Sequence, residues 1–164
     1  MFDVLTRLWS PVEVRATVPG SPGDVWAVLA DPTNYPDWLV GAQQIRAVDA
    51  DFPKPGSKFH HSVGPDEEAT VDDDSRSVVA DPRHRLVLEV HAGPLRGTVD
   101  FRLLPAPDGT EIRFRETMAG PWKPFMPAVR PLLHARNTKS LEQLAAVVAE
   151  RAGSAPGAKA DARS

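Results

Sequence analysis

Residues 12–38 read VEVRATVPGSPGDVWAVLADPTNYPDW, and their pattern predicts a strand followed by two short helical segments. The first seven residues alternate between apolar and polar side chains. The apolar ones are Val12, Val14, Ala16 and Val18. A period of two is typical of a half-buried β-strand. Pro19 and Gly20 then end this strand.

A short helix is predicted directly after this turn. Ser21 can accept hydrogen bonds from the free N–H groups of the first helical turn, and Pro22 has no N–H group to leave unpaired there. Apolar side chains follow at helical spacing, at Val25, Trp26, Val28 and Leu29. Pro32 stops the helix, and residues 33–38 form a second short turn.

Six further strands are predicted between residues 43 and 118. They cover 43–49, 57–63, 68–79, 85–91, 97–104 and 110–118. Strands joined by short turns pair antiparallel, and their alternation gives the sheet one apolar face. A helical pattern from about residue 125 to residue 151 can cover that face. Its stripe comprises Val129, Leu132, Leu133, Asn137, Ser140, Leu141, Leu144 and Val148.

The two ends of the chain fall outside this pattern. We interpret residues 1–10 as an N-terminal extension and residues 11–151 as one domain. Residues 152–164 contain no large apolar side chain, so we expect them to form a disordered tail.

The composition argues against several classes of function. The 164 residues include 19 Lys+Arg and 22 Asp+Glu, which gives a net charge of −3, and there is no cysteine. We therefore expect no nucleic-acid partner and no thiolate site. No segment has the pattern of a signal peptide or a membrane span, which predicts a cytoplasmic protein without stable membrane insertion. His60 and His61 point to opposite faces of one strand, so we expect no metal, and no motif indicates another cofactor.

An acidic run lies between the third predicted strand and the middle of the fourth. Its members are Asp66, Glu67, Glu68, Asp72, Asp73 and Asp74. The run lacks the glycine and the spacing of a calcium-binding loop. We interpret it as a solvated sheet edge that resists strand-to-strand aggregation.

The order of these elements resembles the helix-grip fold of the START/Bet v 1-like (SRPBCC) superfamily, in particular its polyketide cyclase/dehydrase-like branch. The matching residues are Val25-Trp26, Asp31-Pro32, Tyr35-Pro36 and Trp38, then Pro55-Gly56-Ser57, Asp81-Pro82, Gly109-Thr110-Glu111 and the closing SLEQL of 140–144. The resemblance covers about residues 11–151. It implies an α+β fold in which a curved seven-stranded antiparallel sheet wraps around the long C-terminal helix, with two short helices after the first strand. It also implies an apolar ligand-binding cavity between sheet and helix.

Polar residues on the apolar faces are the candidates for chemistry. They are His61, Glu116 and Asp73 on the strands and Asn137 on the long helix. Burying such groups without a partner costs several kcal/mol. His61 and Glu116 are candidates for a catalytic acid and base, or for polar anchors of a ligand. Alternatively, Glu116 is a structural partner of Arg115, Arg136 or a backbone N–H group, and His61 lies at the cavity rim.

Large apolar side chains are candidates for the cavity wall, because aromatic and thioether groups give a large contact area. Two prolines stiffen the segment around Trp122, where the superfamily tends to have its entrance, so we expect a gate there. The candidate ligand-binding residues are Trp38, Phe59, Phe101, Phe114, Met118, Trp122, Phe125, Val129, Leu133 and Asn137.

Two main functions fit this resemblance. The first is binding of a small hydrophobic molecule, such as a lipid, a polyketide or an aromatic metabolite, by a monomer or homodimer. The alternative is a polyketide cyclase or aromatase that folds a poly-β-keto chain in the cavity and transfers protons during aldol closure and dehydration. A third reading is a regulatory or chaperone-associated module that uses the outer sheet face. The small number of inward polar residues favours binding over catalysis.

Overall fold

The structure is a computed structural model, and it describes residues 10–154. The chain begins with β1 (Val12–Val18), α2 (Pro22–Leu29), η1 (Pro32–Asn34) and α3 (Tyr35–Trp38). Six strands follow: β2 (Ala42–Val48), β3 (Lys58–Val63), β4 (Val71–Asp81), β5 (Arg85–Ala92), β6 (Leu95–Ala106) and β7 (Gly109–Met118). The last elements are the 3₁₀ helix η2 (Gly120–Phe125) and the long helix α4 (Met126–Gly153).

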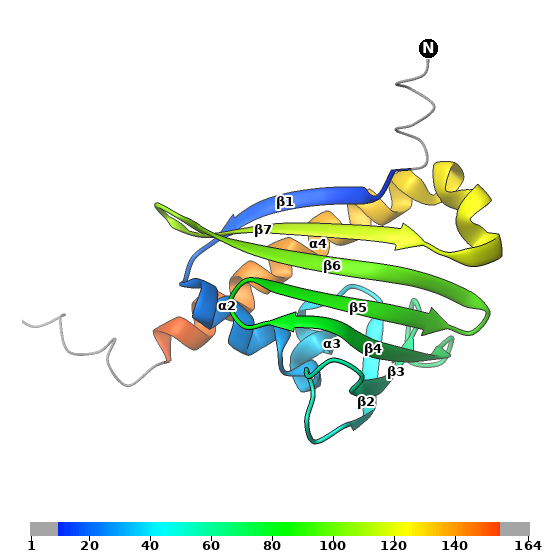
Figure 1. The fold of residues 1–164 in the computed structure, drawn as a ribbon, viewed down its shortest axis with the longest axis horizontal. Coiled ribbons are helices and arrows are strands. Elements are labelled where there is room, and N and C mark those ends of the chain that lie inside the picture. The colour runs from blue at the N-terminus through cyan, green and yellow to red at the C-terminus, as the bar shows by residue number, and fades with distance from the viewer. Residues whose placement is uncertain (1–9, 155–164) are drawn as a thin grey trace, which may run out of the picture.

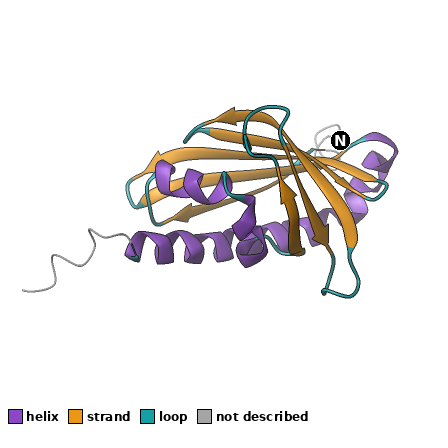
Figure 2. Ribbon diagram, turned by 90° about the horizontal axis from the view of Figure 1, so that it is seen from below, coloured by secondary structure: helices purple, strands orange, loops and turns teal. Residues whose placement is uncertain are grey.

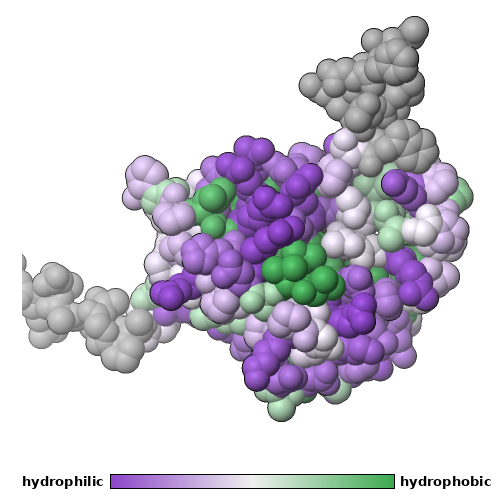
Figure 3. All heavy atoms as spheres, viewed as in Figure 1, coloured by the Kyte–Doolittle hydropathy of each residue, from purple (hydrophilic) through white to green (hydrophobic). Residues whose placement is uncertain are grey.

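The seven strands form one antiparallel sheet in the order β1-β7-β6-β5-β4-β3-β2. In Figure 1, α4 crosses behind the strands, and Figure 2 shows the sheet curving over this helix. The face of the sheet that points away from α4 is mostly hydrophilic, with a hydrophobic patch near its centre (Figure 3). The predicted helix-grip fold is therefore confirmed. No helix within residues 10–154 is long and apolar enough to cross a membrane.

The core lies between the concave face of the sheet and α4. Phe101 on β6 and Phe114 on β7 are paired in register, and their rings stack with centroids 4.5 Å apart. Leu141, Leu144 and Val148 on α4 are buried against this layer. The C-terminal half of α4 therefore fills the concavity of the sheet with tightly packed side chains.

The segment from η1 to α3 is held by hydrogen bonds that satisfy its buried polar groups. Asn34 donates from Nδ2 to the Val28 carbonyl at 3.1 Å and accepts from the Trp38 indole N–H at 2.9 Å. The Tyr35 hydroxyl donates to the Leu29 carbonyl at 2.6 Å. Because the last carbonyls of a helix lack partners within it, these bonds complete the end of α2 and fix α3 against it.

A network at Ser140 ties α4 to the rest of the fold. The Ser140 hydroxyl accepts a hydrogen bond from the Val40 N–H group at 3.1 Å and donates to the Arg136 carbonyl at 3.0 Å. Near the other end of the helix, Arg130 donates to the carbonyl of Ser10 at 2.7 Å. These contacts fix both the rotation and the position of the helix beneath the sheet.

Three expectations from the sequence need correction. Asp72, Asp73 and Asp74 do not lie at a sheet edge, because β4 is flanked by β3 and β5. Leu132 is not buried with the helix stripe but is 70% exposed. The helix extends to Gly153, two residues into the expected tail, while residues 155–164 of that tail and residues 1–9 of the expected extension lie outside the described residues.

Candidate functional site

The sheet and the N-terminal half of α4 enclose a cavity of about 530 Å³. Aromatic side chains line its inner part, namely Tyr35, Trp38, Phe59, Phe101 and Phe114. Its wall also includes Leu95 and Leu132, which are 40% and 70% exposed and therefore lie at its mouth. The volume falls in the range of small-molecule binding sites.

The cavity exists because the packing of α4 changes along its length. In its C-terminal half, Leu144 and Val148 are fully buried. In its N-terminal half, the corresponding wall residues Val129 and Leu133 are only half-buried and face the cavity. On the sheet side, the wall includes smaller residues such as Val90 and Gly97, which leave the space between the two layers open.

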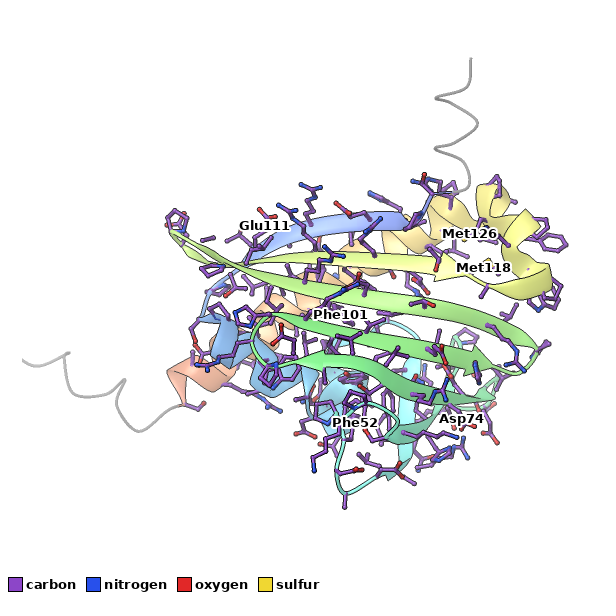
Figure 4. The ribbon with its side chains drawn as sticks, in the orientation of Figure 1. Phe52, Asp74, Phe101, Glu111, Met118 and Met126 are labelled. Carbon is purple, nitrogen blue, oxygen red and sulfur yellow. The ribbon has the colours of Figure 1, made fainter. Side chains whose placement is uncertain are left out.

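Seven of the ten candidate ligand-binding residues lie in the cavity wall. They are Trp38, Phe59, Phe101, Phe114, Met118, Val129 and Leu133. Figure 4 places Phe101 near the middle of the sheet and Met118 toward the end where β7 leads into the helical segments. The alternation of apolar and polar residues along the strands was enough to predict Phe59, Phe101, Phe114 and Met118 on the inner face.

Trp122, Phe125 and Asn137 are not part of the wall. The Trp122 indole donates to the Pro94 carbonyl at 2.7 Å, which turns the ring toward the β5–β6 hairpin. Phe125 packs beside Trp122 and is 54% exposed. Asn137 is fully buried, and its side-chain amide donates a hydrogen bond to Glu116. The wall includes Arg136 and the loop residues 39–41, for which the sequence held no clear signal.

His61 and Asp73 form a buried pair on one wall of the cavity. They lie opposite each other on β3 and β4, with His61 Nε2 3.0 Å from Asp73 Oδ2. Their side chains are only 3% and 7% exposed. Asp73 Oδ1 accepts a hydrogen bond from the His91 backbone N–H group at 3.1 Å. The carboxylate is therefore fixed, and it orients the imidazole.

The same two strands carry a second pair on the opposite face. His60 and Asp74 are neighbours in register, and His60 Nδ1 contacts Asp74 Oδ1. This hydrogen bond is the main cause that holds the pKa of Asp74 below its usual value. The side chains are 36% and 50% exposed, so this pair is a solvated surface feature. The exposed pair His60–Asp74 and the buried pair His61–Asp73 are therefore adjacent along both strands but lie on opposite faces of the sheet.

Glu116 lies in a separate polar cluster of the wall. Its Oε2 accepts hydrogen bonds from Arg136 at 2.5 Å and from the Asn137 amide at 2.8 Å. Of the structural partners considered from the sequence, Arg136 is therefore the one that binds it. His61 on β3 and Glu116 on β7 are four strand spacings apart, or roughly 19 Å along the sheet. Glu116 and His61 thus have different partners and do not form one acid–base pair.

Tyr35 is not available as a reactive group despite its place in the wall. Its hydroxyl is committed to the Leu29 carbonyl. Burial raises the pKa of Tyr35 far above its ordinary value, and the charge of Asp31 adds to this shift. The phenol therefore stays neutral and structural.

The cavity is thus suited to an apolar molecule that carries a few polar groups. It offers an oriented imidazole on β3 and a guanidinium–carboxylate pair at β7 and α4. Within residues 10–154, no cluster of three or more His, Cys, Asp or Glu side chains is placed to hold a metal ion.

Comparison with protein families gives one match over most of the chain. A family described as "Polyketide cyclase / dehydrase and lipid transport" matches residues 11–149. No curated protein sequence shows significant similarity to the chain.

Several solved structures share the fold at low sequence identity. A protein from Rhodobacter sphaeroides has a TM-score of 0.72 at 22% identity, with 87% of this chain and 93% of that chain covered. The di-domain ARO/CYC StfQ from the steffimycin biosynthetic pathway has a TM-score of 0.69 at 19% identity, covering 92% of this chain and 54% of StfQ. DynU16, a protein in the dynemicin biosynthetic locus, has a TM-score of 0.63 at 20% identity, covering 85% of this chain and 47% of DynU16.

Proposed function

Since the chain belongs to the polyketide cyclase/dehydrase and lipid transport family, we propose that it binds a small hydrophobic molecule in the cavity between the sheet and α4. The observation that carries this proposal is the cavity of about 530 Å³ with an aromatic inner wall. Apolar surface of this kind gains free energy when a ligand displaces water from it. Lipids, polyketides and aromatic metabolites all present the required apolar surface.

Titration with N-phenyl-1-naphthylamine tests the proposal. This probe is neutral and apolar, and its fluorescence rises when it leaves water. We expect saturable binding of one probe per chain, with displacement by other apolar molecules. Absence of saturable binding to the folded protein would contradict the proposal. Native mass spectrometry of the purified protein then identifies any molecule retained from the cells.

A second candidate function is cyclisation of a poly-β-keto chain, and the His61–Asp73 pair is the observation that favours it. A carboxylate-oriented imidazole can remove the acidic proton between two carbonyl groups. The resulting carbanion attacks a more distant carbonyl carbon of the chain, and the alkoxide that forms takes the proton back from the imidazolium. Loss of water then gives the cyclic product. StfQ, a di-domain ARO/CYC from the steffimycin biosynthetic pathway, shares this fold.

An assay for conversion of the bound molecule distinguishes binding from cyclisation. A carrier should bind, without changing it, a poly-β-ketone mimic that does not cyclise in buffer alone. A cyclase would convert it to a product that has lost water, which mass spectrometry detects. Replacement of His61 by glutamine should abolish such conversion, whereas conversion that survives this change would argue against His61 as the base.

A further inference from the structure

His61 has one nitrogen that no described residue satisfies. Nδ1 is buried and has no hydrogen-bond partner within residues 10–154. Nε2 on the same ring is paired with Asp73. Buried polar atoms without partners are rare in folded proteins because leaving them unpaired is costly. The imidazole is also part of the cavity wall, so the missing partner can come from a bound molecule.

The neighbours of Asp73 determine what this partner must be. Asp73 Oδ1 accepts a hydrogen bond from the His91 N–H group, and Asp73 Oδ2 lies 3.0 Å from His61 Nε2. The tautomer with the hydrogen on Nε2 sets an N–H group against this carboxylate oxygen, whereas the other tautomer would set two acceptors against each other. In a neutral imidazole, Nδ1 is then a bare acceptor. The partner that it lacks is a hydrogen-bond donor.

The described part of the chain offers Nδ1 no such donor close by. The hydroxyl of Ser75 is 3.5 Å from Nε2, on the other side of the ring. Phe59 packs near the imidazole, with ring centroids 5.0 Å apart, and supplies no polar hydrogen. Because Nδ1 is itself buried, a donor on a bound molecule would reach it only with a small side-chain displacement, of a kind that is common when a pocket fills.

We propose that His61 accepts a hydrogen bond at Nδ1 from a hydroxyl group of the ligand, and that the cavity thereby selects phenols. This inference rests on the proposed function and names the class of molecule bound. The flat apolar ring of a phenol suits the aromatic inner wall, and its hydroxyl is a stronger donor than an aliphatic one. A carboxylate ligand has no donor at neutral pH and would meet the negative charge of Asp73. Asp73 acts as a positioning residue, since it sets which nitrogen of His61 is bare.

Two probes of nearly the same shape test the inference in the unmodified protein. 2-Naphthol carries a hydroxyl donor, and 2-methoxynaphthalene lacks it. Isothermal titration should show 2-naphthol bound about ten-fold more tightly, the effect of one good hydrogen bond. The ¹⁵N signal of His61 Nδ1 should be that of a bare nitrogen in the free protein, and it should shift with 2-naphthol alone.

Asp73→Asn tests the positioning role by reversing the tautomer. The oxygen of the introduced amide would keep the bond from the His91 N–H group, so the NH₂ group of that amide would face His61 Nε2. Nε2 must then be the acceptor, and Nδ1 gains the hydrogen. We expect the preference for 2-naphthol to disappear, because both probes can accept from Nδ1–H. A variant that merely loosened the fold would weaken both probes together.

Asp74→Asn is the matched control, because it makes the same change in the exposed pair on the same strands. It should retain the preference of the unmodified protein. Equal affinities of the two probes for the unmodified protein would overturn the inference and leave the proposed function intact. Failure of both probes to bind would contradict the proposed function itself. If Asp73→Asn does not fold, the two probes and the ¹⁵N signals of the unmodified protein decide the question.

Discussion

Tyr35 is the only tyrosine in the chain, so its ionisation can be followed without interference from other phenols. Burial raises its pKa in the folded protein, while in the unfolded chain the phenol ionises near pH 10. Above that pH the unfolded state releases a proton that the folded state keeps. The free energy of unfolding must therefore fall as the pH rises above about 10.

Tyr35→Phe tests this assignment. The variant should lose about 1–3 kcal/mol at neutral pH, because the buried Leu29 carbonyl loses its donor. The difference between the two proteins should shrink as the pH rises above about 10, since the variant has no phenol to ionise in the unfolded state. Denaturant unfolding at several pH values measures both effects. Tyrosinate absorbance that develops near pH 10 in the folded protein would contradict the assignment.

Glu116 is predicted to stabilise the fold through Arg136. Its side chain is 12% exposed, while that of Arg136 is 34% exposed, so water can partly replace a lost partner. We expect Glu116→Gln to cost about 1–3 kcal/mol. Glu111→Gln is the matched control on β7, since its partner Arg113 lies on the solvated face and the pair should contribute less than about 1 kcal/mol. Equal losses of stability in Glu116→Gln and Glu111→Gln would show that the burial of Glu116 does not strengthen its ion pair.

At the residue scale, the sequence predicted which side chains face inward but not what they touch. Alternation along each strand was enough to place His61, Asp73 and Glu116 on the inner face. The pairing of His61 with Asp73 depends on the register of β3 and β4, and the loop of residues 64–70 leaves that register open. Arg136, one of the partners considered for Glu116, comes from α4 about twenty residues away, and alternation within a strand does not decide among those partners.

The link between α2 and α3 is the element on which the inner wall of the cavity depends. Asn34 is buried and bridges the Val28 carbonyl and the Trp38 indole. We expect Asn34→Ala to cost roughly 1–3 kcal/mol, because it leaves the buried Trp38 indole N–H unpaired, whereas the Val28 carbonyl keeps the Asp31 N–H group as a donor. Thr33→Ala in the same segment should cost less than about 1 kcal/mol, since Thr33 bonds only to the half-exposed Asp31. Thermal unfolding of the two variants measures the contrast, and a similar loss in both would refute this role of Asn34.

At the element scale, local patterns predicted the order and type of nearly every element. The strands, the short helices and the long helix appear at positions close to those expected. The acidic run was misassigned to a sheet edge because a strand's position in the sheet depends on all its neighbours. The conformation of residues 120–125 as η2 was also missed, because three closely spaced prolines and glycines indicate a break without defining its shape.

At the scale of the whole molecule, the cavity follows from a mismatch between one helix and a wide curved sheet. The C-terminal half of α4 packs tightly, and Leu144 lies there rather than beside the cavity. The space remains under the N-terminal half, between Val129 and Val90. The sequence suggested that such a space would exist, but its place depends on how the helix crosses the sheet (Figure 2).

Val90→Phe, with Val78→Phe as its control, provides the central test. Val90 is half-buried in the cavity wall on β5, so a phenylalanine there occupies space that the ligand needs. Val78 on β4 is 40% exposed and is not part of the wall, so the same change there leaves the cavity open. Thermal unfolding and circular dichroism establish that both variants keep the fold.

Fluorescence titration of these proteins with N-phenyl-1-naphthylamine is the most direct measurement. The unmodified protein and Val78→Phe should bind one probe per chain with the same affinity. Val90→Phe should bind at least about ten-fold more weakly, since losing even a few methylene groups of apolar contact amounts to that factor. Unchanged affinity in a folded Val90→Phe protein would show that apolar molecules bind elsewhere, which contradicts a ligand site between the sheet and α4.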